Sequence, residues 1–448
     1  MVASRQRSVA LLALSLLAGC GTSSTDTVGT TGEDTTTGAS PPPLEALAAC
    51  GWESRHLDIA RETSDTTPEE LHQHVADGWA FATTLFHQLA LDEPGNLTIA
   101  PTSLRAVFGM VEAAAAGVTR DELRAALRFT LPDDRLHAAF NRIDATLASR
   151  NLPPEADGES FVALTQANRA WVGRGALVDD AYLELLARSY GAGVELADFY
   201  GAPEPCREVI NWWVEASTKG LIKELLPEMS VTKKTKVVLT NALYLGASWA
   251  ERFEPGNTAI ADFHRLDGVT VQTPMMNKLA AEAMYAEGVD YQALELPLHG
   301  HQLGVVLILP SPGQHAAFEA GLDGARLEEI FDALGYHGGL VRVPKFSTRS
   351  KLSLEEPLRA LGLSTFFDQP MLPALPEIME VTGVFHSTYL AFDEDGVEAA
   401  AASAIILGTD SGVNKEFDFI VDRPFFALIR EHETGELLFF ARIMDPTQ

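Results

Sequence analysis

Apolar residues recur with a helical period in the first half of this chain and with a strand-like pattern in the second half. The first half predicts helices at Leu71–Ala90, Ser103–Ala116, Arg120–Leu127, Asp134–Ser149, Asp179–Tyr190 and Pro205–Leu226. The second half predicts strands at Val237–Leu245, Gly268–Met276, Tyr291–Leu296, Gly304–Leu309, Gly339–Lys345, Phe417–Ile420, Phe425–Glu431 and Leu437–Met444. Helices followed by strands predict an α+β fold with mostly antiparallel sheets.

The composition is that of a globular protein from about Thr67 to the C-terminus, without a second Pro- and Ser-rich linker. We therefore expect one domain over residues 68–448. The chain carries 33 Lys and Arg against 62 Asp and Glu, a net charge of -29. Such a charge repels phosphate backbones and anionic polysaccharides. We expect no nucleic-acid partner and no heparin-like cofactor.

The N-terminus has the features of an export signal. Arg5 and Arg7 precede an apolar run from Val9 to Ala18. This run is too short to cross a bilayer, and its basic start and small-residue end predict a signal peptide over residues 1–19. The ending Leu-Ala-Gly-Cys20 resembles a bacterial lipobox, which implies cleavage before Cys20 and a lipid on its sulfur. A plain secretory signal is the alternative.

A polar segment follows the lipobox. Gly, Ser, Thr and Pro make up 18 of the 23 residues from 21 to 43. We expect residues 20–67 to form a disordered tether that holds the domain some tens of ångströms from a membrane. The expected location is that of an exported lipoprotein, in the periplasm, on the outer membrane or at the cell surface. Membrane contact would occur only through the lipid.

Two further cysteines, Cys50 and Cys206, follow Cys20. In an exported protein such a pair can form a disulfide, and two free thiols are the alternative. Neither cysteine has the flanking sequence of a catalytic protease cysteine.

Other candidate sites are weak. Thr409-Asp410-Ser411-Gly412 lacks the flanking glycines of a chymotrypsin-like nucleophile turn. His72 with His74, and His299 with His301, could form metal-binding pairs, but local spacing fixes no third ligand, so we expect solvated histidines. No phosphate-binding loop follows a strand. We expect no catalytic residues, no metal and no cofactor.

The segment from Glu394 to Ser403 reads EDGVEAAAAS and combines opposed preferences. Alanine favours helix, whereas Gly396 and the following Ile405 and Ile406 favour an extended chain. A conflict between local preferences often marks a functional or strained site. We expect this segment to move.

Several longer segments resemble the serpin family. They are Asn96–Leu104, Asn211–Gly220, Thr240–Tyr244 with Trp249 and Phe253, Phe263 with Asp267-Gly268 and Pro274–Met276, Pro344–Phe346, and Asp422–Phe426. The resemblance covers roughly residues 68–448. It implies an α+β serpin fold of three mostly antiparallel sheets and about eight or nine helices. It also implies a monomer with an exposed reactive-centre loop at about residues 394–416.

The resemblance implies inhibition of proteases rather than catalysis. A target protease attacks the loop and forms an acyl-enzyme, and the cut loop then inserts as a new strand in a central sheet. Counting the family's loop length from Glu394 places the scissile bond between Asp410 and Ser411. The chain from Gly396 to Asp410, at about 3.3 Å per residue, would carry the protease roughly 50 Å.

Insertion requires alternate side chains to face the core. The expected hinge and insertion residues are Glu394, Gly396, Val397, Glu398, Ala399, Ala400, Ala401, Ala402 and Ser403. The inward set is Val397, Ala399, Ala401, Ser403, Ile405 and Leu407. Glu398 is the one charge in the insert, and the alternation gives it the outward parity. A one-residue slip would bury it unpaired at a cost of several kcal/mol, so the register is meaningful. Val397 departs from the Thr or Ser usual in inhibitory members.

Four further residues match family positions around the opening of the sheet. Ser103, Asn241 and His386 match a buried polar cluster, and Trp249 matches the tryptophan at the point of first insertion. Ala100 stands where a serine is common. Ordinary core packing is the alternative role for these side chains.

The side chain before the cut selects the protease. Asp410 demands a basic pocket, which indicates an Asp-directed serine protease or a caspase-like cysteine protease and excludes trypsin-like and chymotrypsin-like enzymes. A cut between Leu407 and Gly408 would instead indicate an apolar pocket. A non-inhibitory serpin, acting as a surface binding or chaperone-like protein, is the alternative function.

Overall fold

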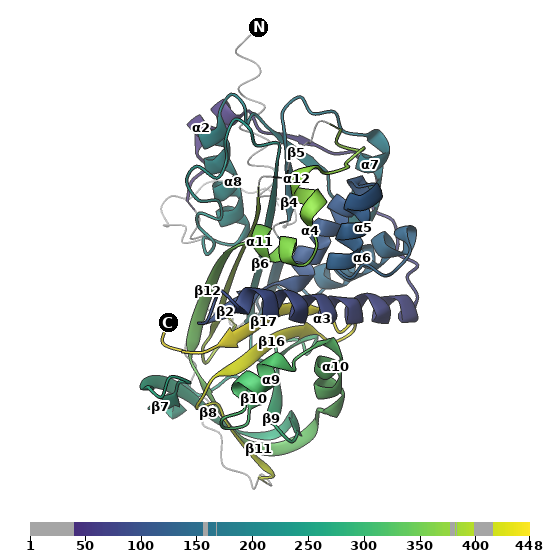
Figure 1. Ribbon diagram of the computed structural model, residues 1–448. Helices are drawn as coiled ribbons and strands as arrows, with labels where there is room; N and C mark the ends of the chain where they lie inside the picture. Colours follow the sequence, from purple (N-terminus) through teal and green to yellow (C-terminus); the bar gives the residue numbers. More distant parts are fainter. Residues whose placement is uncertain (1–39, 156–159, 167, 377–380, 382, 398–414) are drawn as a thin grey trace, which may run out of the picture. The chain divides into compact units, whose positions relative to one another are not determined.

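A computed structural model describes residues 40–155, 160–166, 168–376, 381, 383–397 and 415–448 (Figure 1). Several of the residues singled out above lie outside this part: Cys20, Glu398, Ala399, Ala400, Ala401, Ala402, Ser403, Asp410 and Ser411. Within the described residues, no helix is both long and apolar enough to cross a membrane.

The described residues contain eleven α-helices, somewhat more than expected. They are α2 (Leu44–Cys50), α3 (Pro68–Ala90), α4 (Pro101–Ala114), α5 (Gly117–Ala126), α6 (Asp133–Ala148), α7 (Asp180–Leu185), α8 (Pro203–Ser217), α9 (His315–Ala320), α10 (Gly324–Ala333), α11 (Glu355–Ala360) and α12 (Ser364–Asp368). The unexpected helices are α2 and the four short helices α9 to α12. A π-helical turn, Leu186–Tyr190, extends α7.

The longest helix, α3, begins at a complete capping box. The Thr67 hydroxyl accepts a hydrogen bond from the Glu70 amide at 3.3 Å, and the Glu70 carboxylate accepts one from the Thr67 amide at 2.9 Å. Pro68 occupies the first helical position, where its fixed φ suits a helix. The buried side of α3 packs on a strand near the C-terminus. There the rings of Phe86 and Phe440 are stacked, with their centroids 4.5 Å apart.

The helix expected over Pro205–Leu226 ends earlier, at Ser217. Lys219 adopts a positive φ of 50°, which is incompatible with a continuing helix. The Asn211 side chain then donates to the Leu226 carbonyl at 3.0 Å and accepts from its amide at 2.7 Å. These two hydrogen bonds fold the remaining residues back along α8 as a loop.

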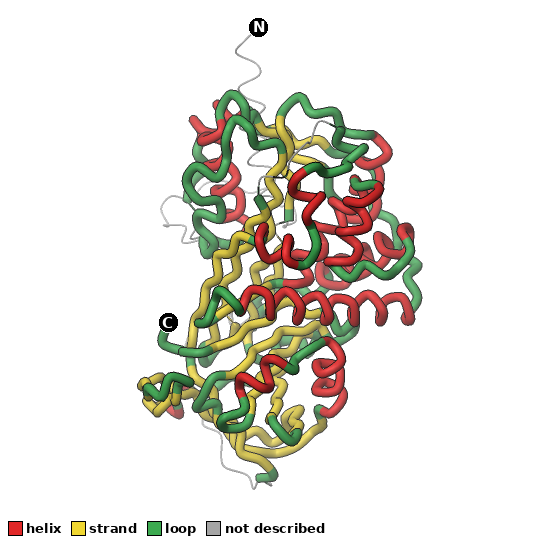
Figure 2. Tube along the Cα trace, viewed as in Figure 1, coloured by secondary structure: helices red, strands yellow, loops and turns green. Residues whose placement is uncertain are grey.

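The strands of the described residues form two hydrogen-bonded sheets, and Figure 2 shows them in yellow. The central sheet has the order β1 (Glu53–Arg55), β5 (Val194–Ala197), β4 (Arg169–Gly173), β6 (Val237–Ser248), β14 (Gly396–Val397), β13 (Val384–Phe392) and β12 (Phe346–Ser353), with β3 (Val162–Gln166) on β6. The second sheet has the order β15 (Phe417–Ile420), β11 (Gly335–Pro344), β8 (Thr270–Glu287), β9 (Tyr291–Pro297), β10 (Leu303–Pro310), β16 (Phe425–Glu431), β17 (Leu437–Ile443) and β2 (Leu97–Ile99), with β7 (Ala259–His264) on β8.

The sheets are mostly antiparallel, as expected, but the described strands form two sheets where we expected three. The difference lies in β8, which runs unbroken for 18 residues. One end of β8 pairs with β7 and the other end pairs with β9, while β11 pairs with residues 275–285 of β8. A single long strand thus connects two groups of strands into one curled sheet.

The two faces of the central sheet belong to different apolar clusters. Along β6, Val237, Leu239 and Leu243 lie in the main core with α3 to α6, whereas Val238 and Ala242 lie in a second cluster with α2 and α8. This alternation follows from the two-residue period of a strand. The central sheet is therefore buried on both faces near the middle of β6.

Part of the segment 20–67, which we expected to form a disordered tether, is folded in the structure. Residues 40–67 pack against the folded body, since α2 buries Leu47 and Cys50 beneath α8 and β1 pairs with β5 at the sheet edge. The apolar residues of α2, together with Cys50, provide the contacts that a Thr- and Ser-rich tether lacks. The folded part of the chain therefore begins well before residue 68.

Candidate functional site

The hinge enters the central sheet as a two-residue strand, β14, between β6 and β13. Gly396 and Val397 pair antiparallel with Ser248 and Ala247 of β6. Val397 also pairs antiparallel with Phe392 of β13. The chain after β13 therefore turns back and begins a new strand of the sheet.

β14 separates β6 from β13 at one end of the two strands, and β6 and β13 pair directly with each other at the other end. They pair in parallel over Leu239–Ala242 and Val384–Ser387. Residues 243–246 of β6 and 388–391 of β13 have no pairing with each other in the described part of the chain. Their other edges pair with β3 and β12. Among described strands, the position between β6 and β13 is taken only by β14, at one end.

Gly396 and Val397 fit this position closely. A Cβ at residue 396 would lie 2.0 Å from the Ala247 carbonyl oxygen, so only glycine allows this approach of the two strands. The side chain of Val397 is 1% exposed and belongs to the main core. Val397 thus faces the main core, which is the side that we expected for it in an inserted strand.

Glu394 anchors the residues before the strand. Its carboxylate accepts hydrogen bonds from Lys345 Nζ at 2.5 Å and from the Thr258 hydroxyl at 2.8 Å. Burial alone would raise the pKa of Glu394, but the hydrogen bonds from Lys345 and Thr258 lower it below its ordinary value. The ionised form therefore ties the hinge to the start of β12 and to the segment before β7.

Trp249 holds the hinge backbone. Its indole Nε1 donates to the Asp393 carbonyl at 2.8 Å, and its amide donates to the Asp395 carbonyl at 2.9 Å. The indole is 3% exposed and packs edge-on against Phe392, with ring centroids 5.5 Å apart. The structure thus places Trp249 where the resemblance implied, at the point where the loop enters the sheet.

A buried polar cluster lies where β6 and β13 rejoin. His386 and Asn241 are register partners on these strands, and the His386 Nδ1 lies 2.7 Å from the Asn241 Oδ1. The Ala100 amide donates to His386 Nε2 at 3.0 Å, so Nε2 accepts and Nδ1 must donate. Burial lowers the pKa of His386 to about 3, which keeps the ring neutral. The Asn241 amide in turn donates to the Ser103 hydroxyl at 2.7 Å.

Asn168 completes this cluster and was not identified from the sequence. Its Oδ1 accepts from the Ser103 hydroxyl at 2.8 Å and from the Asn241 amide at 2.8 Å. A polar residue directly before the buried strand β4 was the available signal. Separation of β6 from β13 would break the hydrogen bond from His386 to Asn241, because it crosses between the two strands.

Comparisons with known proteins agree with this architecture. The family model described as Serpin (serine protease inhibitor) matches residues 78–446. An uncharacterized serpin-like protein of Thermococcus kodakarensis is 32% identical over 371 residues, covering 82% of this chain and 84% of that protein. Human antithrombin-III is 30% identical over 380 residues, covering 82% of this chain and 80% of that protein. This chain belongs to the serpin family.

Solved structures confirm the serpin fold. Uncleaved ovalbumin matches with a TM-score of 0.75 at 22% identity, over 83% of this chain and 99% of that chain. Serpin48 of the insect Tenebrio molitor matches with a TM-score of 0.72 at 25% identity, over 84% of this chain and 98% of that chain.

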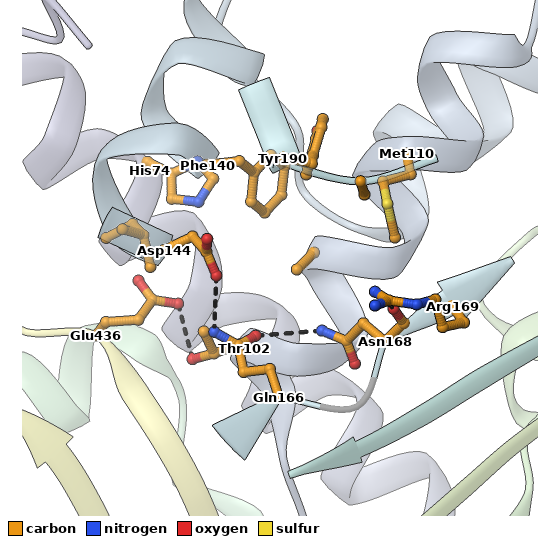
Figure 3. Close-up of a pocket in the computed structure, with 13 residues that line it drawn as sticks. His74, Thr102, Met110, Phe140, Asp144, Gln166, Asn168, Arg169, Tyr190 and Glu436 are labelled. Atoms are coloured by element: carbon orange, nitrogen blue, oxygen red, sulfur yellow. Dashed lines mark hydrogen bonds between the residues drawn. The ribbon is translucent and has the colours of Figure 1, made fainter. Parts of the chain in front are cut away.

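A cavity of about 140 Å³ adjoins the polar cluster of this serpin (Figure 3). Asn168 lies on one side of the cavity, and its amide donates to Gln166 Oε1 at 3.2 Å. His74 and Glu436 lie on the opposite side, and burial lowers the pKa of His74 well below its ordinary value and raises the pKa of Glu436 to about 6. We expected His74 to be solvated, but it is 1% exposed, because it lies on the buried side of α3.

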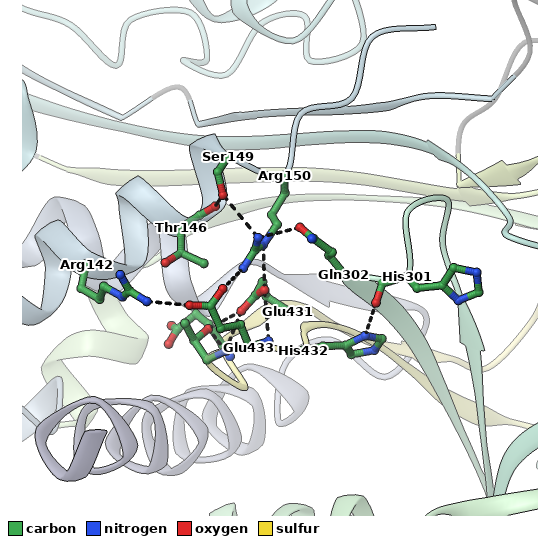
Figure 4. Close-up of polar contacts among 11 residues, drawn as sticks. Arg142, Thr146, Ser149, Arg150, His301, Gln302, Glu431, His432 and Glu433 are labelled. Atoms are coloured by element: carbon green, nitrogen blue, oxygen red, sulfur yellow. Dashed lines mark hydrogen bonds and ion pairs between the residues drawn. The ribbon is translucent and has the colours of Figure 1, made fainter. Parts of the chain in front are cut away.

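A second polar network surrounds Arg150 (Figure 4). Glu431 is fully buried and accepts a hydrogen bond from Arg150 Nε at 2.8 Å. The neighbouring His432 contacts the His301 carbonyl through Nδ1 at 2.9 Å. The contact with His301 holds the turn between β9 and β10. In the same turn, the His299 amide donates to the Ser248 carbonyl at 2.8 Å. The turn thus contacts the residue of β6 that pairs with Gly396.

Cys50 and Cys206 form a disulfide between the end of α2 and the first turn of α8. Both cysteines are fully buried in the second apolar cluster. Of the two alternatives from the sequence, the structure has the disulfide. No group of three or more His, Cys, Asp or Glu side chains suited to a metal ion occurs in the described residues.

Proposed function

We propose that this serpin is a suicide-substrate inhibitor whose loop is cut between Asp410 and Ser411. The observation that carries the proposal is β14, because Gly396 and Val397 already occupy the first position of an additional strand between β6 and β13. A loop cut after Asp410 would be free to continue that strand. The protease, held as an acyl-enzyme on Asp410, would be carried along with it.

The register of β14 indicates how insertion would continue. Val397 pairs with Ala247, so the antiparallel register would set Ala399 beside Leu245 and Ala401 beside Leu243. Leu245 and Leu243 belong to the main core, as Val397 does. Each added residue would pair with the open edges of β6 and β13, and alternate small or apolar side chains would be buried.

Target choice follows from Asp410. The acidic side chain requires a basic specificity pocket, and an exported inhibitor would meet secreted serine proteases rather than cytosolic caspases. Antithrombin-III, named for its action on thrombin, and chicken neuroserpin, 30% identical over 375 residues, are relatives of this chain. Their names support protease inhibition as the general activity but do not bear on the target.

The test is complex formation on a denaturing gel. The full chain, mixed with a secreted endopeptidase specific for acidic residues, should give a denaturant-stable band at the mass of the protease plus the chain up to Asp410. The released C-terminal fragment should begin at Ser411. Trypsin should give no such band. A fragment beginning at Gly408 would instead support the cut between Leu407 and Gly408.

Substitution of the residue before the cut separates specificity from inhibition. Asp410→Arg should transfer complex formation from the acid-specific enzyme to trypsin. The matched control is Asp262→Arg, an exposed aspartate on β7, which should leave the target unchanged. Unchanged specificity of the Asp410→Arg variant would show that the scissile bond lies elsewhere.

Val397 gives the alternative function its support. A β-branched apolar residue at the first insertion position is already packed in the core, which favours a settled hinge and a non-inhibitory binding or chaperone-like role. The same gel decides between the roles. Cleavage at Asp410 with no complex and no gain in thermal stability would exclude inhibition and leave the binding role.

We also propose that the protein is an exported lipoprotein anchored through Cys20 and monomeric at the membrane. The basic, apolar and small residues before Cys20 support the proposal. Cells expressing the full chain should yield a membrane-associated, lipid-labelled protein, and Cys20→Ser should move it to the soluble fraction. Equal membrane association of both forms would contradict lipid anchoring.

A further inference from the structure

Helix α8 lies across the line along which β6 and β13 would separate. Its buried residues share one apolar cluster with Trp171 of β4 and with Val238 and Ala242 of β6. Phe385 of β13 packs against the same cluster. Ala242 pairs with Ser387 and Thr240 pairs with Phe385, so these contacts lie where the two strands still touch. Helix α8 therefore bridges the two strands between which a new strand would insert.

Residues 40–55, which we call the strap, fasten α8 at both ends. At its first turn, Cys206 is joined to Cys50 by the disulfide. Near its last turn, Trp212 Nε1 donates to the Ser40 carbonyl at 3.1 Å, and the Ser40 hydroxyl donates to Glu215 Oε1 at 2.9 Å. The strap thus runs antiparallel to α8 along its whole length, with α2 packed against it.

The strap is also fixed to the edge of the central sheet. Its strand β1 pairs antiparallel with β5, and Trp52 Nε1 donates to Glu195 Oε2 at 2.7 Å. The rings of Trp52 and Trp171 lie 5.4 Å apart. The strap and α8 are therefore bound to the half of the sheet that contains β5, β4 and β6. Their cluster contacts the other half through Phe385 of β13.

We propose that the strap is a clamp on α8 that slows the separation of β6 from β13, with Cys50, Cys206 and Trp212 as its positioning residues. The inference rests on the proposed insertion function. A strand entering between β6 and β13 needs room beneath α8, on the face now filled by the shared cluster. A helix tied at both ends resists the tilt that would open this room. Release of the strap should therefore speed insertion.

The experiment measures strand insertion without any protease. A synthetic peptide with the sequence of residues 397–410 is added to the full oxidised chain, and its incorporation is followed as a gain in thermal stability over time. We expect a Cys50→Ser/Cys206→Ser double variant to incorporate the peptide about tenfold faster than the unaltered chain, because part of the clamp's stabilisation is lost before the transition state.

A second variant and a control separate clamping from general destabilisation. Trp212→Phe keeps the disulfide and removes the hydrogen bond to Ser40, so it should accelerate incorporation about two- to threefold. It also serves if the double variant fails to fold. The control is Phe331→Leu, at a buried position of α10, which lies far from α8 in Figure 1. It should lower the free energy of unfolding without changing the incorporation rate.

Each outcome decides the proposal. Equal or slower incorporation in the double variant, or in Trp212→Phe where the double variant does not fold, overturns the clamp, and so does equal acceleration by Phe331→Leu. Formation of the protease complex by the same variants would then show that the proposed inhibition survives. Failure of every form to take up the peptide would overturn both the clamp and insertion between β6 and β13.

Discussion

Gly396 shows how one residue without a side chain sets the geometry of the hinge. A Cβ there would lie 2.0 Å from the Ala247 carbonyl oxygen and 2.7 Å from the Ser248 Cα. Both are backbone atoms, which cannot turn aside as a flexible side chain can. The sequence marked Gly396 only as a break beside an alanine run. The close approach that requires glycine became visible through the pairing with β6.

The variant Gly396→Ala tests this contact. We expect a loss of about 1–3 kcal/mol in the free energy of unfolding, because β14 or β6 must shift to admit the methyl group. Urea titration measures the loss. Gly256→Ala is the matched control, since nothing lies within 4 Å of the added Cβ, and it should change stability by less than about 0.5 kcal/mol. Equal effects of the two substitutions would contradict the role of Gly396.

Glu394 makes the stability of the hinge depend on pH. Because its pKa is lowered from 4.5 in the folded chain, its contribution is complete above pH 4.5 and disappears as the pH falls through the folded value. Glu394→Gln should cost about 1–2 kcal/mol at pH 7, where the charged hydrogen bond to Lys345 is lost. The difference from the unaltered chain should shrink as the pH falls below 4.5.

Thermal unfolding between pH 7 and pH 3 measures this difference. The exposed Glu254 provides the control, and Glu254→Gln should have little effect at any pH. A Glu394→Gln cost that stays constant down to pH 3 would show that the ionised carboxylate is not the stabilising form.

At the scale of elements, the sequence predicted the longer helices and strands with clear apolar periods, and it missed two strands that bury polar residues. The main helices α3 to α6 lie within a few residues of their predicted ranges, and β15 and β16 match theirs. The strands β12 and β13 were not predicted. In β12 the buried positions include Thr348 and Ser350, and in β13 they include His386, Ser387 and Thr388.

These polar residues have a structural reason to be there. Ser350 accepts from the Thr98 amide at 2.9 Å, and Thr388 donates to the Thr98 carbonyl at 2.9 Å, so β12 and β13 hold β2 through side chains. A hydropathy pattern cannot distinguish such buried hydroxyls from exposed ones. Of the two strands on either side of β14, apolar β6 was therefore predicted from the sequence, and β13, which buries polar residues, was not.

The turn between β9 and β10 depends on the charge of His432. Burial alone would lower the pKa of His432, but the hydrogen bond and charge of Glu295, 2.7 Å from Nε2, raise it above 6.5. The pKa of Glu295 is correspondingly lowered to about 2. The Glu295–His432 pair stabilises the fold fully only above pH 4.5, the ordinary pKa of a glutamate. Its contribution is lost again as the pH rises through the raised pKa of His432.

His432→Gln should therefore be most destabilising near pH 6, by about 1–2 kcal/mol, and less so at pH 9. Urea titration at both values gives the comparison. His72→Gln, whose side chain is 70% exposed, is the control and should show no such trend. An equal cost at pH 6 and pH 9 would mean that protonated His432 is not the stabilising form.

At the scale of the whole molecule, the register of β14 connects the hinge to the strap. Continuing the antiparallel pairing of Val397 with Ala247 places Asp410 beside residue 234, in the turn that leads into β6. The neighbouring Lys233 and Lys236 lie in a group with Arg174, whose side chain donates to the Gly51 carbonyl of the strap. A protease carried by full insertion would therefore end beside the strap, on the side where the described chain begins.

Full insertion also tests the parity of the loop. In this register Ala399 would face the main core beside Leu245, and Ala400 would face the opposite side beside Tyr244. Ala399→Arg should leave cleavage after Asp410 intact but abolish both the gain in thermal stability and the trapped complex, because an unpaired charge would be buried. Ala400→Arg, one residue away, should retain both.

Calorimetry before and after cleavage, with the gel as a second reading, distinguishes the two variants. Their reversal, with Ala400→Arg inactive and Ala399→Arg active, would mean that the strand enters one residue out of the register set by β14. Since such a slip exchanges the faces of every side chain in the insert, it would also bury Glu398. The alanine run tolerates either face, so the register depends on Gly396 and Val397, the two residues that pair with β6.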